Sequence, residues 1–135
     1  MSVKKLKFKY VLKSKKRPTV NFKTRSIRND SSKDEEAVAH DTKLQLTRPE
    51  IKKIYDSKYV SVEVINYYKT TQQKLWDLPK ETRADCDNYL KLFCDAVNGI
   101  LWKDDGKIHS MASKKYWAKK AYSEVIITYD NTLYN

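Results

Sequence analysis

Apolar residues alternate with lysines along the first dozen positions of the chain: Leu6, Phe8, Tyr10 and Leu12, with Lys5, Lys7 and Lys9 between them. A period of two predicts a strand that buries one face and leaves its lysines on the open face. From Lys13 to Asn29 no regular period continues, and this segment is predicted to be a loop.

Three more strands are predicted farther along the chain. Tyr59–Tyr68 is β-branched and aromatic throughout, which makes it the clearest of them. The segments Lys107–Tyr116 and Glu124–Tyr129 follow near the carboxyl end. Between these strands, residues 69–83 are mostly polar and are predicted to form a loop. In that loop, Trp76 either belongs to a small satellite of the core or provides a platform on which a base stacks.

Two main helices are expected between the strands. The first opens at Ser31–Glu35, where hydroxyl and acidic residues suit a helix entrance. It should run to about Thr47, because Arg48-Pro49 is expected to end it. After that break, Glu50–Tyr55 suits a further helical turn or two.

The second main helix is predicted from Asn88, where the apolar period becomes three to four residues. The positions on its apolar face are Leu90, Cys94, Val97 and Leu101, widened by Phe93. Gly99 suits a left-handed stop after the helix. These elements predict an α+β domain with a mixed sheet and two main helices packed on one of its faces. A chain of 135 residues is expected to form a single domain over 1–135, with a basic strand and loop at 1–29 and a tail at 131–135.

Positive charge is concentrated at the amino terminus. Residues 1–29 contain eleven Lys or Arg and no acid, so the formal net charge of +11 is carried by this segment alone. Such a field attracts polyanions through release of their counterions. A solvated basic arm is the alternative, but the ordered alternation of the first strand favours contact with nucleic acid.

Residues 84–108 instead gather acidic residues around the second helix: Asp85, Asp87, Asp104 and Asp105, with Lys91 beside them. If Ala84–Asp87 is extended, Asp85 and Asp87 point to the same face. Asp105-Gly106 is a reverse-turn signal between two strand-like runs. Either acidic pair alone would suit a cap or a turn. Together they favour a site for a hard cation, because crowded carboxylates resist ionisation unless a cation lies between them.

The same residues carry a family resemblance. Asp85-x-Asp87-Asn88-x-x-Lys91, then Asp95–Gly99, then Trp102-x-Asp104-Asp105-x-x-Ile108 resembles the core signature of the RusA-type Holliday junction resolvases, and Ser14–Pro18 is similar to the basic loop of that family. The resemblance implies a homodimeric endodeoxyribonuclease that resolves four-way DNA junctions by paired symmetric nicks, in recombination and repair. Its cofactor would be Mg²⁺, with Mn²⁺ as a possible substitute, and no small-molecule substrate is implied.

Roles are carried over by position in this signature. Asp85, Asp87 and Asp105 would be metal ligands and catalytic residues, Lys91 the essential lysine and Asp104 an auxiliary acid. Ala84, Cys86 and Tyr89 depart from the common family pattern without removing a charged group. Contacts with branched DNA are expected from the basic residues Lys13, Lys15, Lys16, Arg17, Lys23, Arg25, Arg28, Lys114 and Lys115.

Other features exclude several classes of protein. No apolar run approaches the ~20 residues that span a bilayer, and no apolar secretory segment follows Met1–Lys5. A cytoplasmic protein is therefore expected, and the resemblance implies a bacterial or phage origin. Cys86 and Cys94 are expected to be reduced and buried. The alternative function is a non-catalytic nucleic-acid-binding protein of the ribosomal or architectural type, which leaves the acidic residues unexplained.

Overall fold

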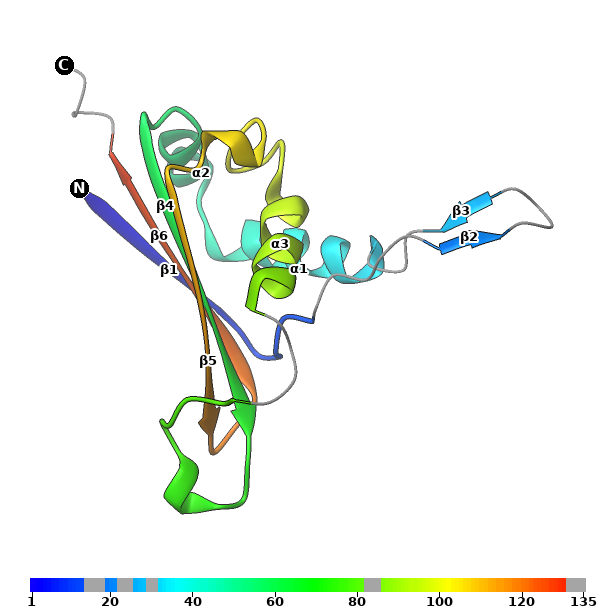
Figure 1. Cartoon of the computed structure of the whole chain (residues 1–135). Coiled ribbons are helices and arrows are strands. Elements are labelled where there is room, and N and C mark those ends of the chain that lie inside the picture. Colours follow the sequence, from blue (N-terminus) through cyan, green and yellow to red (C-terminus); the bar gives the residue numbers. More distant parts are fainter. Residues whose placement is uncertain (14–18, 22–25, 29–31, 82–85, 131–135) are drawn as a thin grey trace.

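The computed structural model describes residues 1–13, 19–21, 26–28, 32–81 and 86–130. They form a small α+β domain in which helices cover one face of a mixed four-stranded sheet (Figure 1). The strands lie in the order β1 (Ser2–Phe8), β6 (Tyr122–Asp130), β4 (Tyr59–Lys69) and β5 (Ser110–Ala118). β6 pairs antiparallel with both β1 and β4, whereas β4 and β5 are parallel. The expected mixed sheet is therefore confirmed.

The described residues include three α-helices, one more than the two main helices expected: α1 (Ser32–Gln45), α2 (Arg48–Tyr55) and α3 (Cys86–Val97). The additional helix α2 is the predicted further turn or two. α1 ends before Arg48-Pro49, as expected, and Pro49 itself lies in the first turn of α2, where an amide is not needed. Thr47 and Glu50 complete a capping box at its start. No helix in the described ranges is long and apolar enough to cross a membrane.

Two differences concern the amino-terminal segment. The alternation predicted to Leu12 ends as a strand at Phe8, although Leu12 is still buried. Within the predicted loop Lys13–Asn29, β2 (Thr19–Asn21) and β3 (Ser26–Arg28) pair as a short antiparallel ribbon. Val20 and Ile27 are register partners in this ribbon, whose strands of three residues each are too short to show a period in the sequence.

The core lies between the sheet and the helices. Its largest buried side chains come from every layer: Phe8 from β1, Ile127 from β6, Val38 from α1, Tyr89 and Phe93 from α3, and Trp102 from the turn after α3. In β4, Val60, Val62 and Val64 are fully buried at every second position, as the pleat of a strand requires. Of the two free cysteines, Cys94 is buried as expected, but Cys86 is only half-buried.

A buried polar contact holds the chain after β1. The side-chain amide of Asn66 donates to the carbonyl of Leu12 at 2.9 Å, and the backbone amide of Leu12 donates to the hydroxyl of Ser123 at 2.9 Å. The Ser123 hydroxyl in turn donates to the side-chain oxygen of Asn66. Because all three residues are buried, these bonds fix the point from which the basic segment leaves the sheet.

Candidate functional site

Of the first acidic pair, the structure describes Asp87, which lies in the first turn of α3. Asp87 is exposed there, and Cys86 before it is already helical, so the extended segment expected over Ala84–Asp87 does not reach these two residues. Asp85 lies outside the described residues. The hydroxyl of Ser113 on β5 donates to the carbonyl of Cys86 at 2.8 Å, which ties the first turn of α3 to the sheet. Asp87 thus lies on a helical turn that is hydrogen-bonded to the sheet.

Tyr89 provides a second tie between α3 and β5. Its buried hydroxyl lies 2.8 Å from the carbonyl oxygen of Lys114 and 3.0 Å from the sulfur of Cys86. Burial is the main cause that raises the pKa of the Tyr89 phenol, so the hydroxyl stays protonated and can donate. Nothing in the sequence marked Tyr89 or Ser113 as supporting residues. Tyr89 is not among the apolar positions predicted for the helix, and Ser113 is a polar residue in a predicted strand.

We expect Tyr89→Phe to destabilise the fold by about 1 kcal/mol, the net value of one such hydrogen bond. For a chain of this size the melting temperature should fall by about 3–5 °C. Thermal unfolding followed by circular dichroism measures the change. Tyr59→Phe is the matched control, because the Tyr59 hydroxyl has no hydrogen bond to any described residue. Equal melting temperatures for the two variants would show that the Tyr89 hydroxyl does not hold α3.

The second acidic pair lies after α3. The chain leaves the helix through Gly99, whose φ of +80° confirms the predicted left-handed stop. Asp104 then precedes a single 3₁₀ turn over Asp105–Lys107 and accepts a hydrogen bond from the Gly106 amide at 2.9 Å. A Cβ at Gly106 would lie 2.8 Å from that carboxylate oxygen, so a larger residue there would displace the Asp104 side chain. Asp104 therefore shapes the turn, and Asp105 beside it is exposed.

Asp87 and the pair Asp104 and Asp105 lie at opposite ends of α3. β4 and β5 are parallel, so α3 has to run back along the sheet between them, and the residues before and after it are separated by its length. At about 1.5 Å per residue, α3 rises about 15 Å from Asp87 to Val97. The pKa of the Cys94 thiol agrees with this placement: burial chiefly, and then the carboxylates of Asp105 and Asp95, raise it to about 12. Asp105 is thus near the carboxyl-terminal half of the helix.

Whether the predicted acidic residues can bind one metal ion together depends on this separation. Carboxylate oxygens are the ligand type that Mg²⁺ prefers, so the donor chemistry fits. The positions do not: within the described ranges, no three His, Cys, Asp or Glu side chains stand close enough together to hold an ion. Asp85, the nearest sequence neighbour of Asp87 in the predicted set, is not among those residues. The described part of one chain therefore brings Asp87 and Lys91 together but not Asp87 and Asp105.

Lys91 lies one helical turn after Asp87 and is exposed. No ion pair joins the two side chains, both of which the structure describes. The Lys91 ammonium group lies on the same side of α3 as the Asp87 carboxylate and has no ion-pair partner among the described residues.

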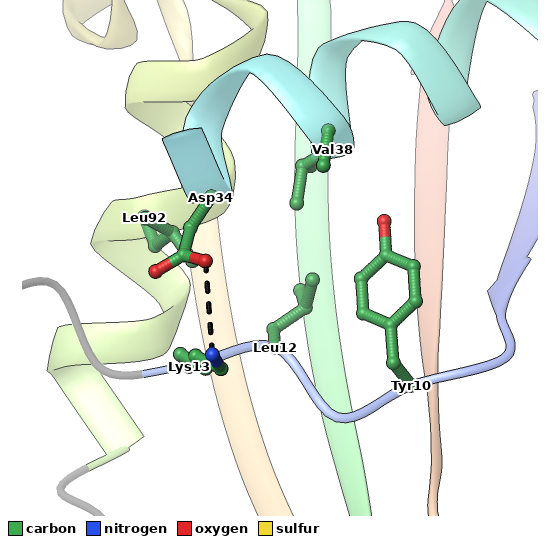
Figure 2. A pocket seen from close by; sticks show the side chains of 7 residues that line it. Tyr10, Leu12, Lys13, Asp34, Val38 and Leu92 are labelled. Carbon is green, nitrogen blue, oxygen red and sulfur yellow. Dashed lines mark ion pairs between the residues drawn. The ribbon is translucent and has the colours of Figure 1, made fainter. Parts of the chain in front are cut away.

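The predicted DNA-binding residues are placed only in part. Lys15, Lys16, Arg17, Lys23 and Arg25 lie outside the described residues, and of Arg28 only the backbone, in β3, is described. Lys13 is exposed, and its ammonium group is 3.9 Å from the Asp34 carboxylate of α1. Figure 2 shows this pair at the rim of a pocket of about 270 Å³ between α1 and the chain after β1, with Leu12, Val38 and Leu92 in its wall.

Lys114 and Lys115 lie on β5, near the first turn of α3. The ammonium group of Lys114 is exposed and lies 3.5 Å from the Glu63 carboxylate on β4. Lys80, which the sequence did not single out, lies over the rings of Tyr68 and Trp117, at 4.8 Å and 5.2 Å from their centroids. The segments 67–80 and 114–120 each contain lysines close to aromatic residues, and this was the available signal for the arrangement.

Comparison with known proteins places the chain in a family. A family model described as endodeoxyribonuclease RusA matches residues 10–128. These residues include β4, β5 and β6 except the last two residues of β6, and both acidic pairs, whereas β1 lies before the match. No curated protein gives a significant match. The family match covers most of the 135 residues and includes residues 14–18 and 85–108, which carry the resemblance seen in the sequence. The chain belongs to the RusA family of endodeoxyribonucleases.

Proposed function

We propose that this protein is a metal-dependent endonuclease that resolves four-way DNA junctions by paired symmetric nicks. The observation that carries the proposal is the match of the RusA family model to residues 10–128. Composition supports it, because the net charge of +11 attracts a polyanion. No feature of the described residues favours the non-catalytic alternative, which gives no reason for an exposed carboxylate and an exposed lysine on the same turns of α3.

The chemistry proposed is hydrolysis of a phosphodiester bond. Lys91 is a compact cation on a fixed helix, and such a charge stabilises the negative charge that develops on a phosphate in the transition state. Lysines on β5 and in the amino-terminal segment would hold neighbouring phosphates and set the position of the strand without reading its sequence. Ser113 and Tyr89 would keep the Asp87 carboxylate in a constant position.

Mg²⁺ is the proposed cofactor, with Mn²⁺ as a substitute. The proposed ligands are Asp85, Asp87 and Asp105, with Asp104 as an auxiliary acid. Because the described chain separates Asp87 from Asp105 by most of α3, we derive no catalytic step through a metal held by both. The Gly106 amide already binds one oxygen of Asp104, which makes Asp104 the weakest of the proposed ligands.

We also propose that the active form is a homodimer. Resolution needs two nicks on opposing strands, and a two-fold symmetric dimer supplies two equivalent sites with the symmetry of the junction. The face of the sheet opposite the helices is the surface available for contact between the copies (Figure 1). It carries Tyr67 stacked on Tyr122 and Tyr116, with ring centroids 4.3 Å and 5.9 Å apart.

A substrate comparison tests the proposed function. A synthetic four-way junction, a linear duplex and a single strand of the same sequences are incubated with the protein in Mg²⁺, in Mn²⁺ and in a chelator. We expect cleavage of the junction alone, at symmetric positions in two opposing strands, and none in chelator. A protein that binds the junction but cuts no substrate in either metal would be the non-catalytic alternative.

A further inference from the structure

Residues 70–81, which follow β4, are folded back onto the edge of the sheet. Four backbone hydrogen bonds of 2.9–3.0 Å join this segment to β5 or its end: Thr70 to Ala118, Asp77 to Trp117, Trp117 to Leu78, and Lys80 to Lys115. In Figure 1 this segment extends beyond the end of the sheet, beside the turn that joins β5 to β6. Its polar composition suggested only a loop, but these bonds give it a defined position on the fold.

The segment and the β5–β6 turn enclose an open hollow of about 560 Å³. Lys69, Lys119 and Lys120 line it together with the half-buried ring of Trp76. The indole nitrogen of Trp76 donates to the carbonyl of Thr70 at 3.0 Å, so the one polar atom of the ring is satisfied within the protein. What the indole offers to the hollow is therefore its flat apolar surface.

The charge around the hollow has one predominant sign. Residues 69–81 and 114–120 contain seven lysines and two acids, a net charge of +5. The ammonium group of Lys119 lies 5.9 Å from the centroid of the Trp76 ring. A lysine side chain is flexible, so Lys119 can exchange this weak contact for a phosphate. The hollow therefore combines two features of surfaces that bind single strands, a basic lining and an aromatic ring.

We propose that this hollow binds an unpaired stretch of a DNA strand, with Lys69, Lys119 and Lys120 on its phosphates and the indole of Trp76 stacked on one base. The inference rests on the proposed function, for which it names a DNA subsite. A base can reach a ring inside a hollow only when it has left its own helical stack, so paired DNA would contact the lysines alone. Unpaired bases at a branch point satisfy that condition, whereas those of a continuous duplex do not.

The hollow is linked through β5 to the amino-terminal end of α3. Lys80 is bonded to Lys115 of β5, and Tyr89 of α3 is bonded to the adjacent Lys114. The segment that forms the hollow and the first turn of α3 are thus held by neighbouring residues of β5. A strand in the hollow would lie toward the end of α3 that carries Asp87, and away from the end near Asp105.

Binding measured in chelator tests the subsite without any contribution from cleavage. The three probes are an oligothymidylate, a four-way junction and a linear duplex, each followed by fluorescence anisotropy. We expect Trp76→Leu to weaken binding of the oligothymidylate and the junction by about tenfold, the scale of one lost base–aromatic stack. Its affinity for linear duplex should stay within about twofold of wild type. Trp76→Phe, which keeps an aromatic face, should retain most of the affinity.

A lysine pair provides the second variant. Lys119→Ala with Lys120→Ala should lower the log–log salt slope for the oligothymidylate by up to about 1.4, at about 0.7 per phosphate contact on a single strand. The matched control is Lys53→Ala with Lys58→Ala, which removes two exposed lysines at the other end of β4. The control should change the slope much less. If Trp76→Leu fails to fold, judged by its melting curve, the exposed lysine pair decides the question.

Three results separate the subsite from the proposed function. Wild-type cleavage of the junction together with unchanged binding by both hollow variants would overturn the subsite and leave the function standing. Equal losses on all three probes by a Trp76→Leu protein that is folded would also overturn it, since a ring that stacks on an unpaired base makes no such contact with a duplex. Selective loss of binding by the hollow variants, together with a wild-type protein that never cuts the junction, would support the subsite and overturn the nuclease.

Discussion

Asp87→Asn should lose junction cleavage by roughly a thousandfold or more, while binding the junction at least as tightly as the wild-type protein. The loss follows if the carboxylate binds the catalytic metal, whose stabilisation of transition-state charge is worth several kcal/mol. Binding should be kept or improved, because the change removes one negative charge that repels the phosphates. Asp87 is exposed on a turn held by Ser113, so the substitution should leave the fold unchanged.

The same substitution at Asp85 and at Asp105 tests the other two proposed ligands. Asp85, Asp87 and Asp105 are all proposed ligands, yet α3 separates Asp87 from Asp105. Single-turnover cleavage and gel-shift assays on each Asp→Asn variant show which end of the helix carries the chemistry. Glu36→Gln, which removes an exposed charge from α1, is the control and should cut normally. Full activity in any one of the three variants would remove that aspartate from the site.

Lys91→Ala should lower the single-turnover rate by roughly a hundredfold, the scale on which loss of one positioned donor acts. Lys91 is exposed and forms no ion pair with Asp87, both being described residues, so its removal should barely change stability. Lys91→Arg should rescue poorly, because a planar guanidinium does not replace a compact ammonium charge.

The control for Lys91 is Lys43→Ala, an exposed lysine in the last turn of α1. Both alanine variants lose one positive charge, so a general electrostatic effect would slow them equally. Melting curves confirm that each variant is folded. A Lys91→Ala protein that cuts as fast as Lys43→Ala would show that Lys91 has no part in the reaction.

Most of the elements could be predicted from local patterns. The strand predicted from alternation (β1), the strand predicted from β-branched and aromatic residues (β4), the helical period of α3 and the stop at Gly99 all appear in the structure, since each depends on residues close together in the chain. The end of the first helix before Arg48-Pro49 is confirmed as well, and the capping residue Thr47 shows that the same proline lies in the first turn of α2.

The arrangement around the acidic residues was harder to predict. Asp105-Gly106 suggested a turn between two strand-like runs, but the apolar residues before it, Leu101 and Trp102, are buried in the turn after α3. The parallel pairing of β4 with β5 depends on contacts between distant segments, and that pairing is what moves Asp105 away from Asp87. The fold of residues 70–81 rests on backbone bonds to β5, which side-chain patterns do not reveal.

Cleavage of a supercoiled plasmid that extrudes a cruciform tests the central claim most directly. In Mg²⁺, a homodimer of wild-type chains should cut both strands at the base of the cruciform within one binding event and give linear product. Wild-type chains mixed with an excess of Asp87→Asn chains should accumulate nicked circles, because a mixed dimer has one working site. Plasmid that stays supercoiled while the wild-type protein is bound to it in Mg²⁺ would contradict the account.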